Sequence, residues 1–215
     1  MFIITERWAD IFTLTDEQGV YLVKLARQVI GSKLGLAEPP VPIKDDPTLN
    51  VNCGVFVTLN EHAKGNRGLR GCIGLPYPTT PLVDAVIQAA SSAAFEDPRF
   101  PPVQPKEMDG ITIEVSVLTP PEKIEEKEPS DIVNSVVVGR DGLIVGQGWN
   151  KGLLLPQVPV EWGWDSKEFL NQCCVKAGLP QKSWLEPRIE IYTFQAILFK
   201  EDDPRGNISR HRLSD

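Results

Sequence analysis

Gly54-Val-Phe-Val-Thr-Leu59 and Leu69-Arg-Gly-Cys-Ile-Gly74 are the two stretches that decide the predicted fold. The first is rich in β-branched and aromatic residues, which is typical of a buried strand. The second is a short apolar strand in which the glycines indicate close backbone approach or a bulge. Residues 60–68 between them have the composition of a turn or loop, so we expect two neighbouring strands of one sheet.

Helical patterns flank this predicted hairpin on both sides. A helix is expected from Thr15 to Gly35, with a capping box at its start and a glycine cap at its end. A second helix is expected to begin at Pro81 and to end before Asp97-Pro98, because proline suits a first turn and disfavours helix just before it. The alternation in Ile111 to Leu118 then predicts a strand with one wet or functional face.

From Thr119 the composition changes and predicts a smaller unit. The acidic run 122–128 is typical of a solvated surface connector. A hairpin is expected within 136–145, an extended segment at 153–158, and a helix after the capping-box pair Asp165 and Glu168. The strong alternation at 189–199 predicts a long closing strand.

These elements together favour an α+β fold. The strands are joined by loops, hairpins and only some helices, without the steady βαβ repetition of a doubly wound sheet. We expect a mostly antiparallel sheet with helices packed on one face, plus a smaller α/β subdomain. The larger α/β subdomain is expected to contain 1–118 and 186–215, and the smaller one 119–185.

Composition limits the classes of function. The 215 residues are 41% hydrophobic and 24% charged, as in ordinary globular proteins. A net charge of −7 repels phosphate backbones and anionic membranes, so nucleic acid is a poorly favoured partner. The basic residues Arg205, Arg210, His211 and Arg212 are expected in a solvated tail. Four cysteines without a regular framework and an N-terminus without a signal pattern predict a cytoplasmic protein away from the membrane.

Motifs for common cofactors are missing from the sequence. It has no Gly-x-Gly-x-x-Gly opening a helix, no Walker sequence, no His-Glu-x-x-His and no Cys-x-x-Cys. We therefore predict no cofactor and no metal. Of the two histidines, His62 is expected in a loop and His211 in the tail, so a histidine-assisted nucleophile would have to recruit His62.

Five blocks of the chain resemble the AMMECR domain family: Gly54 to Leu59, Leu69 to Gly74, Asp97-Pro-Arg-Phe-Pro-Pro102, Gly152-Leu-Leu-Leu-Pro-Gln-Val158 and Glu161-Trp-Gly-Trp164. The most specific is Leu-Arg-Gly-Cys-Ile-Gly, and the resemblance runs from about the first helix to the last strand. It implies that the whole chain is one AMMECR domain of two subdomains, without an established activity. It also implies a pathway shared with a radical-SAM protein and a Memo-like protein, such as the modification of a biomolecule.

Cys72 and Arg70 are the first candidate site residues. A thiol beside a cation and exposed amides can have a lowered pKa and act as a nucleophile, which would make Cys72 catalytic. Burial in a strand explains the cysteine equally. Arg70 is expected either to hold a carboxylate or phosphate of a ligand or to form a structural ion pair with Glu114 or Asp97.

Two further groups carry polar and aromatic side chains. Asp97, Arg99 and Phe100 are expected to cap a helix and lock a turn rather than to bind a ligand. Gln157, Glu161, Trp162 and Trp164, in a proline-punctuated loop, are expected either to line a pocket or to pack between subdomains.

We predict that one cleft between subdomains joins these groups, with Cys72 as the catalytic candidate and Arg70, Gly71, Gln157, Glu161 and Trp164 as substrate-binding residues. The ligand is an unidentified small molecule or a protein partner.

Three functions remain open at this point. The chain is an enzyme or enzyme subunit, a noncatalytic binding or scaffold protein, or, least favoured, a nucleic-acid-associated protein.

Overall fold

The computed structural model describes residues 13–63 and 66–211, and the side chains of 62, 63, 66 and 67 are left out of the description. The described residues divide into two compact units, a larger one of 13–118 and 197–211 and a smaller one of 119–196. The second boundary therefore follows Ala196, whereas the sequence placed it after residue 185. The residues from 190 to 194 pair with the smaller sheet, which moves this boundary.

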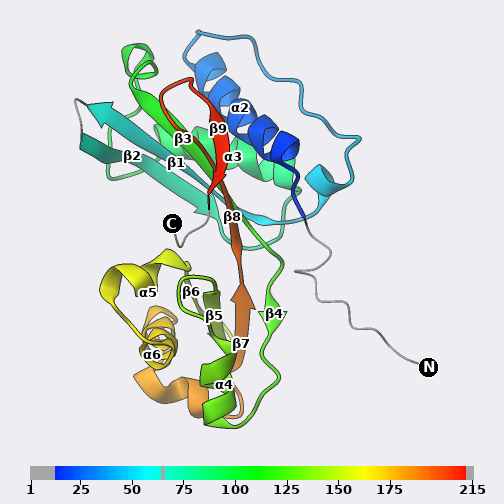
Figure 1. Ribbon diagram of the computed structural model, residues 1–215, viewed down its shortest axis with the longest axis vertical. Helices are drawn as coiled ribbons and strands as arrows, with labels where there is room; N and C mark the ends of the chain where they lie inside the picture. Colours follow the sequence, from blue (N-terminus) through cyan, green and yellow to red (C-terminus); the bar gives the residue numbers. More distant parts are fainter. Residues whose placement is uncertain (1–12, 64–65, 212–215) are drawn as a thin grey trace. The chain divides into compact units, whose positions relative to one another are not determined.

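The larger unit contains a five-stranded sheet in the order β2-β1-β3-β8-β9 (Figure 1). The strands are β1 (Gly54–Ala63), β2 (Asn66–Leu75), β3 (Ile111–Leu118), β8 (Ala196–Glu201) and β9 (Ile208–His211). β1 pairs antiparallel with both β2 and β3, which confirms that the two opening stretches are neighbouring strands. The prediction of a loop at 60–68 is wrong, because residues 60–63 and 66–68 extend the two strands.

Helices α2 (Asp16–Lys33) and α3 (Leu82–Phe95) cover one face of this sheet (Figure 1). The predicted capping box forms, since Thr15 and Gln18 exchange side-chain-to-backbone hydrogen bonds of 2.9 and 3.2 Å. Alternate strand residues point to the helices and form the core with them, among them Val55, Val57, Leu59, Ile113 and Val115. The other residues of these strands form a second, more polar face. Short 3-10 turns lie at Thr48–Asn50 and Pro105–Glu107.

The smaller unit has its own sheet and core. Its strand order is β4-β7-β5-β6, with β4 (Glu122–Lys123), β5 (Gly142–Gln147), β6 (Asn150–Leu154) and β7 (Glu190–Phe194). Its helices are α4 (Pro129–Ser135), α5 (Gln157–Trp162) and α6 (Ser166–Lys176), with a 3-10 turn at Gln181–Leu185. The core is built around the buried residues Leu143, Val145, Phe169, Leu170, Cys173, Trp184 and Ile191.

Several predicted segments differ from the structure. The closing strand 189–199 is two strands, because the chain leaves the smaller sheet after β7 and enters the larger one as β8. The predicted hairpin at 136–145 forms later, between β5 and β6. Residues 157–158 begin helix α5 rather than extending a strand. Pro159 is tolerated there because it lies in the first turn, where its missing N–H has no intrahelical partner.

The predicted basic tail is also partly wrong. Residues 208–211 form the edge strand β9, paired with β8. Arg210 pairs with Asp16 at 2.9 Å and its guanidinium lies 4.8 Å from the Phe199 ring centre. Arg205 pairs with Asp109 at 3.0 Å, while Arg212 lies outside the described residues. No helix in the described ranges is both long and apolar enough to span a bilayer.

Candidate functional site

The edge of β2 is closed by the turn that follows α3. An edge strand presents free backbone N–H and C=O groups, which invite pairing with other chains unless they are covered. The Cys72 N–H donates to Asp97 Oδ2 at 2.8 Å, and Arg99 Nη2 donates to the Cys72 carbonyl at 3.1 Å. The Leu-Arg-Gly-Cys-Ile-Gly and Asp-Pro-Arg-Phe blocks therefore form one structural site.

Asp97 is the centre of this contact. It is 4% exposed and accepts hydrogen bonds from the Arg99 backbone N–H and from Nε and Nη2 of the Arg99 guanidinium. The Arg99 guanidinium, together with the N–H of Cys72, holds the pKa of Asp97 well below its ordinary range. The expectation that Asp97 and Arg99 lock the turn is confirmed, whereas the C-cap of α3 is Glu96 and not one of these residues. The turn also fastens the edge of β2.

Arg70 is re-aimed by a β-bulge. The register of β1 and β2 shifts between Leu59 and Asn60, directly opposite Arg70. Its Nε donates to Glu107 Oε1 at 2.7 Å and its Nη2 donates to the Pro101 carbonyl at 2.9 Å. A structural ion pair is present, but the predicted partners were wrong, because a residue distant in sequence is brought next to Arg70 only by the bulge and the turn.

The Arg70 side chain keeps one unused donor group. It is 7% exposed as a residue, and its Nη1 is buried with no hydrogen-bond acceptor among the described residues. The guanidinium also lies 5.9 Å from the ring centre of Phe100, whose ring is 5.5 Å from the Arg99 guanidinium. The ion pair lowers the pKa of Glu107, which keeps that carboxylate charged.

Cys72 is a half-buried free thiol. Its Sγ accepts a hydrogen bond from Thr58 Oγ1 at 3.2 Å. Burial raises the pKa of the thiol, although Thr58 and the nearby Arg99 act in the opposite direction. The thiolate is therefore disfavoured at neutral pH, and a catalytic role for Cys72 stays a prediction.

Gly71 shows the close backbone approach that the sequence indicated. A Cβ at this position would lie 2.2 Å from the Ala93 carbonyl oxygen of α3. A Cβ at Gly74 would meet the Phe56 ring at 2.2 Å. Neither glycine has a positive φ, so steric approach and not backbone conformation selects glycine here.

A row of polar residues crosses the sheet on the face away from the helices. Thr58 is directly opposite Cys72 on one side and Glu114 on the other. Burial raises the pKa of Glu114, and nearby Lys200 partly opposes this shift. Sequence patterns alone do not bring these three residues together, although the alternation of β3 predicts a wet or functional face.

The Gln157 to Trp164 group lies in the smaller unit and is ordered by helix α5. Gly163 closes the helix with φ of 65°, and the Trp164 N–H donates to the Pro159 carbonyl at 2.8 Å. Trp162 is 70% exposed and stacks on the half-buried Trp164 with ring centres 6.0 Å apart. Glu161 is exposed and Gln157 is half-buried.

A cavity of about 780 Å³ in the smaller unit is lined by other residues, drawn from 123–132, 146–148 and 184–191. Because Cys72 and Glu161 belong to different units, their common cleft stays a prediction. Across 13–63 and 66–211, no group of acidic, histidine and cysteine side chains is arranged to hold a metal ion.

The histidines are both in strands rather than in a loop and a tail, with His62 in β1 and His211 in β9. His211 Nε2 lies 3.0 Å from Ser209 Oγ and 3.7 Å from Asp202 Oδ1. One ring nitrogen faces both groups, whereas a catalytic triad uses the two nitrogens for separate partners. This cluster therefore lacks triad geometry.

Comparison with known proteins gives the family. The AMMECR1 family model matches residues 23–199, which is most of the chain. The chain belongs to the AMMECR1 family. A protein of Thermococcus gammatolerans is 53% identical over 94% of this chain and 100% of its own length. Protein MJ0810 of Methanocaldococcus jannaschii is 48% identical over 93% of this chain and 98% of its own length.

A solved structure supports the AMMECR1 fold assignment. The crystal structure titled uncharacterized protein PH0010, from Pyrococcus horikoshii, is similar with a TM-score of 0.79 and 51% sequence identity. The match covers 93% of this chain and 98% of that one. The α+β class predicted from the sequence is confirmed. The family blocks quoted above all lie within residues 23–199, which the family model matches.

Proposed function

We propose that this AMMECR1 protein is a small-ligand-binding enzyme subunit of a biomolecule-modification pathway, and that Arg70 binds an oxygen acceptor of the ligand. The observation that carries the proposal is the Nη1 of Arg70, which has no hydrogen-bond acceptor among the described residues although the side chain is only 9% exposed. An unsatisfied buried donor costs roughly 1–3 kcal/mol, more when it is charged. A ligand carbonyl or carboxylate oxygen would supply the missing acceptor.

The charge around Arg70 narrows the class of ligand. Glu107 compensates Arg70, and Asp97 compensates Arg99, so the local charge of the four side chains is balanced. A multiply charged phosphate would gain little from this balance. A ligand with a single carboxylate or an amide carbonyl fits this balance better.

The polar row favours chemistry beside this binding group. The raised pKa of Glu114 is suited to a general acid that is protonated closer to neutral pH than an ordinary carboxyl group. Thr58 lies between Glu114 and Cys72 in the row. In this proposal Cys72 forms a wall hydrogen-bonded to Thr58, and Gly71 permits close approach of the strand to α3.

The proposed pathway rests on the family resemblance, which implies that it is shared with a radical-SAM protein and a Memo-like protein. We propose these two proteins as functional partners. Gln157, Glu161 and Trp164 are proposed to contact the ligand or a partner from the smaller unit, because Glu161 and the Trp162 ring are accessible. The noncatalytic alternative assigns the same residues to docking alone, and the raised thiol pKa of Cys72 favours it.

Ligand-induced thermal stabilisation tests the binding proposal. The melting temperature would be measured with a panel of monocarboxylates, amides and inorganic phosphate, using wild type, Arg70→Met and Arg140→Met. Arg140 pairs with Asp141 in the smaller unit and serves as a matched control for loss of an arginine–carboxylate pair. We expect stabilisation that disappears only in Arg70→Met; equal stabilisation of all three proteins would refute a role for Arg70.

Alkylation separates the catalytic and noncatalytic assignments of Cys72. Iodoacetamide labelling of the native protein would be followed by peptide mass spectrometry at pH 7 and compared with the same peptide after unfolding. The raised pKa predicts slower labelling in the native state, because the thiolate is the reactive form. Faster native labelling would restore Cys72 as a nucleophile.

A further inference from the structure

A second cavity, of about 350 Å³, lies entirely within the larger unit. Its volume falls in the range of roughly 300–1,000 Å³ that is usual for small-molecule sites. One part of its lining is apolar and contains Leu36, Met108 and Ile208. The other part is charged and contains Lys24, Arg27, Glu201 and Arg205. The lining thus combines an apolar surface with more cations than carboxylates.

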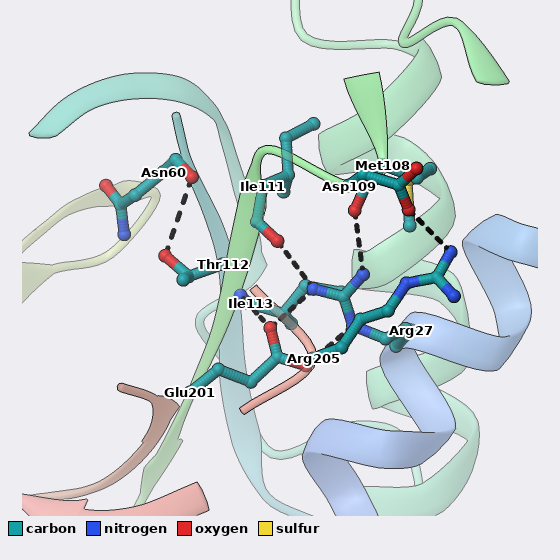
Figure 2. Close-up of polar contacts among 9 residues, drawn as sticks. All are labelled: Arg27, Asn60, Met108, Asp109, Ile111, Thr112, Ile113, Glu201 and Arg205. Carbon is teal, nitrogen blue, oxygen red and sulfur yellow. Dashed lines mark hydrogen bonds and ion pairs between the residues drawn. The ribbon is translucent and has the colours of Figure 1, made fainter. Parts of the chain in front are cut away.

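Two of the charged residues neutralise each other. Arg27 Nε donates to Glu201 Oε1 at 2.6 Å, while its other nitrogens donate to the carbonyl oxygens of Met108 and Ile111 (Figure 2). Glu201 also accepts from the Ile113 N–H at 3.0 Å. Arg27 and Glu201 are therefore hydrogen-bonded to each other and to the backbone, and their charges cancel. The positive charge that could attract an anion to the cavity comes from Lys24 and Arg205.

Arg205 occupies an unusual backbone position. Its φ of 59° is the sole positive φ of a non-glycine residue in the described ranges, although Gly206 follows it directly. A side chain is disfavoured in this region, where glycine is the usual residue. Such outliers, when they persist, concentrate at functional sites. The presence of arginine at a position where the backbone favours glycine therefore suggests that the Arg205 side chain has a function.

The contact that Arg205 makes within the protein is weak. Its Nη2 lies 3.0 Å from Asp109 Oδ1, and the two side chains are 59% and 81% exposed (Figure 2). Exposed pairs of this kind contribute little and exchange readily with other partners. Lys24 is likewise exposed at the cavity. Both cations are therefore free to turn toward an anion.

We propose that this cavity binds a small amphipathic carboxylate, with its apolar chain against Leu36, Met108 and Ile208 and its carboxylate between Lys24 and Arg205. The apolar lining provides burial for the chain, and the two cations provide the charge. The site is separate from Arg70 and does not depend on the function proposed above.

Calorimetric titration of the full chain with octanoate tests the site, with 1-octanol and inorganic phosphate as probes of the two halves. The site requires both an apolar chain and an anion, so octanoate should bind at least tenfold more tightly than either probe. If octanol binds as tightly as octanoate, the cavity is a hydrophobic site that does not recognise the carboxylate, and the proposal is overturned. Phosphate binding as tightly would show a bare anion site and equally overturn it.

Arg205→Gly is the decisive variant, because glycine suits the backbone position and removes the cation. We expect its unfolding midpoint to equal or exceed that of wild type, while its octanoate affinity falls at least fivefold. Lys24→Gln should show a similar loss. Lys167→Gln, which removes an exposed charge from α6 of the smaller unit, should bind octanoate like wild type.

Unchanged octanoate affinity in Arg205→Gly, or an equal loss in Lys167→Gln, would overturn the assignment.

Discussion

Half-buried Arg27 and buried Arg70, both in the larger unit, each pair with a glutamate and a backbone carbonyl, but they differ in the hydrogen-bonding groups that they leave unused. Arg27 holds Glu201 and two backbone carbonyls, and each of its nitrogens has an acceptor. Arg70 holds Glu107 and the Pro101 carbonyl, and its Nη1 has no acceptor among the described residues. The side chain of Glu201 is 3% exposed, whereas that of Glu107 is 26% exposed.

The difference separates an ion pair that completes the fold from one that leaves binding capacity. Arg27 joins helix α2 to the start of β3 and the end of β8, and Glu201 returns a bond to the Ile113 N–H. Removing Arg27 would leave the Glu201 carboxylate buried without its cationic partner. If Arg70 is removed, the Glu107 carboxylate can be hydrated, because its side chain is 26% exposed. The Nη1 of Arg70 has no acceptor among the described residues, so the stability of the fold depends less on this ion pair.

Arg27→Met is expected to cause the largest loss of stability. The uncompensated Glu201 carboxylate should cost about 3–5 kcal/mol in the free energy of unfolding, measured by urea denaturation. Lys123→Met in the smaller unit is the control, because the side chains of the Lys123–Glu190 ion pair are 42% and 53% exposed and the Glu190 carboxylate stays in water. If the two variants unfold at the same urea concentration, the Arg27–Glu201 ion pair does not stabilise the fold more than an exposed pair does.

Gly71→Val is expected to have the next largest effect. Its Cβ would be forced to 2.2 Å from the Ala93 carbonyl, and overpacking of this kind costs about 1–3 kcal/mol. Cys72→Ala, the neighbouring control, should cost less, because it removes only a half-buried thiol. Gly74→Val should fall between them, since the group it meets is the ring of Phe56 and not backbone. Equal melting temperatures for all three variants would contradict this order.

Arg70→Met sharpens the comparison directly. Loss of the pair should cost about 1–2 kcal/mol, clearly less than Arg27→Met, because Glu107 reaches solvent and no satisfied Nη1 bond is lost. Urea denaturation at pH 7 of both variants in parallel gives the difference. A larger loss in Arg70→Met than in Arg27→Met would mean that the unpartnered nitrogen has an acceptor in solution that stabilises the fold.

The smallest expected effect concerns acid stability. The pKa of Asp97 is lowered from an ordinary 3.8, mainly by Arg99, so its stabilisation is present above that pH and is lost as pH falls toward the folded-state pKa. Asp97→Asn should therefore lose less stability than wild type between pH 6 and pH 3. Glu114→Gln should not share this benefit, because the Glu114 pKa is raised and its stabilisation is lost as pH rises. Parallel acid limbs for wild type and Asp97→Asn would contradict the assignment.

Local sequence patterns predicted much of the fold and little of the site. Capping-box patterns and hydrophobic periodicity located helices α2 and α6, alternation located β3, and runs of β-branched or apolar residues located β1 and β2. Alternation did not reveal that 189–199 passes from one sheet to another, because the period of a strand is the same in either sheet. The chain changes partner at Gln195, where no glycine or proline interrupts the pattern.

The contacts at the candidate site could not be predicted from the sequence for a different reason. Cys72, Arg70, Asp97 and Arg99 were all identified as polar candidates, yet their partners depend on a bulge and on the return of a turn to the edge of β2. Neither leaves a periodic signal in sequence. For the same reason Glu107 was overlooked, since it follows β2 by more than thirty positions and lies in a short 3-10 turn.

The two chain crossings between the units lie side by side. The Thr119 N–H donates to the Gln195 carbonyl at 2.8 Å, and the Gln195 N–H donates to Thr119 Oγ1 at 2.8 Å. The smaller unit is thus inserted in the chain between β3 and β8, which are neighbouring strands of the larger sheet. Because Thr119 and Gln195 are hydrogen-bonded to each other, a short turn could replace the smaller unit. A different domain could also be inserted at the same place without changing the strand order of the larger sheet.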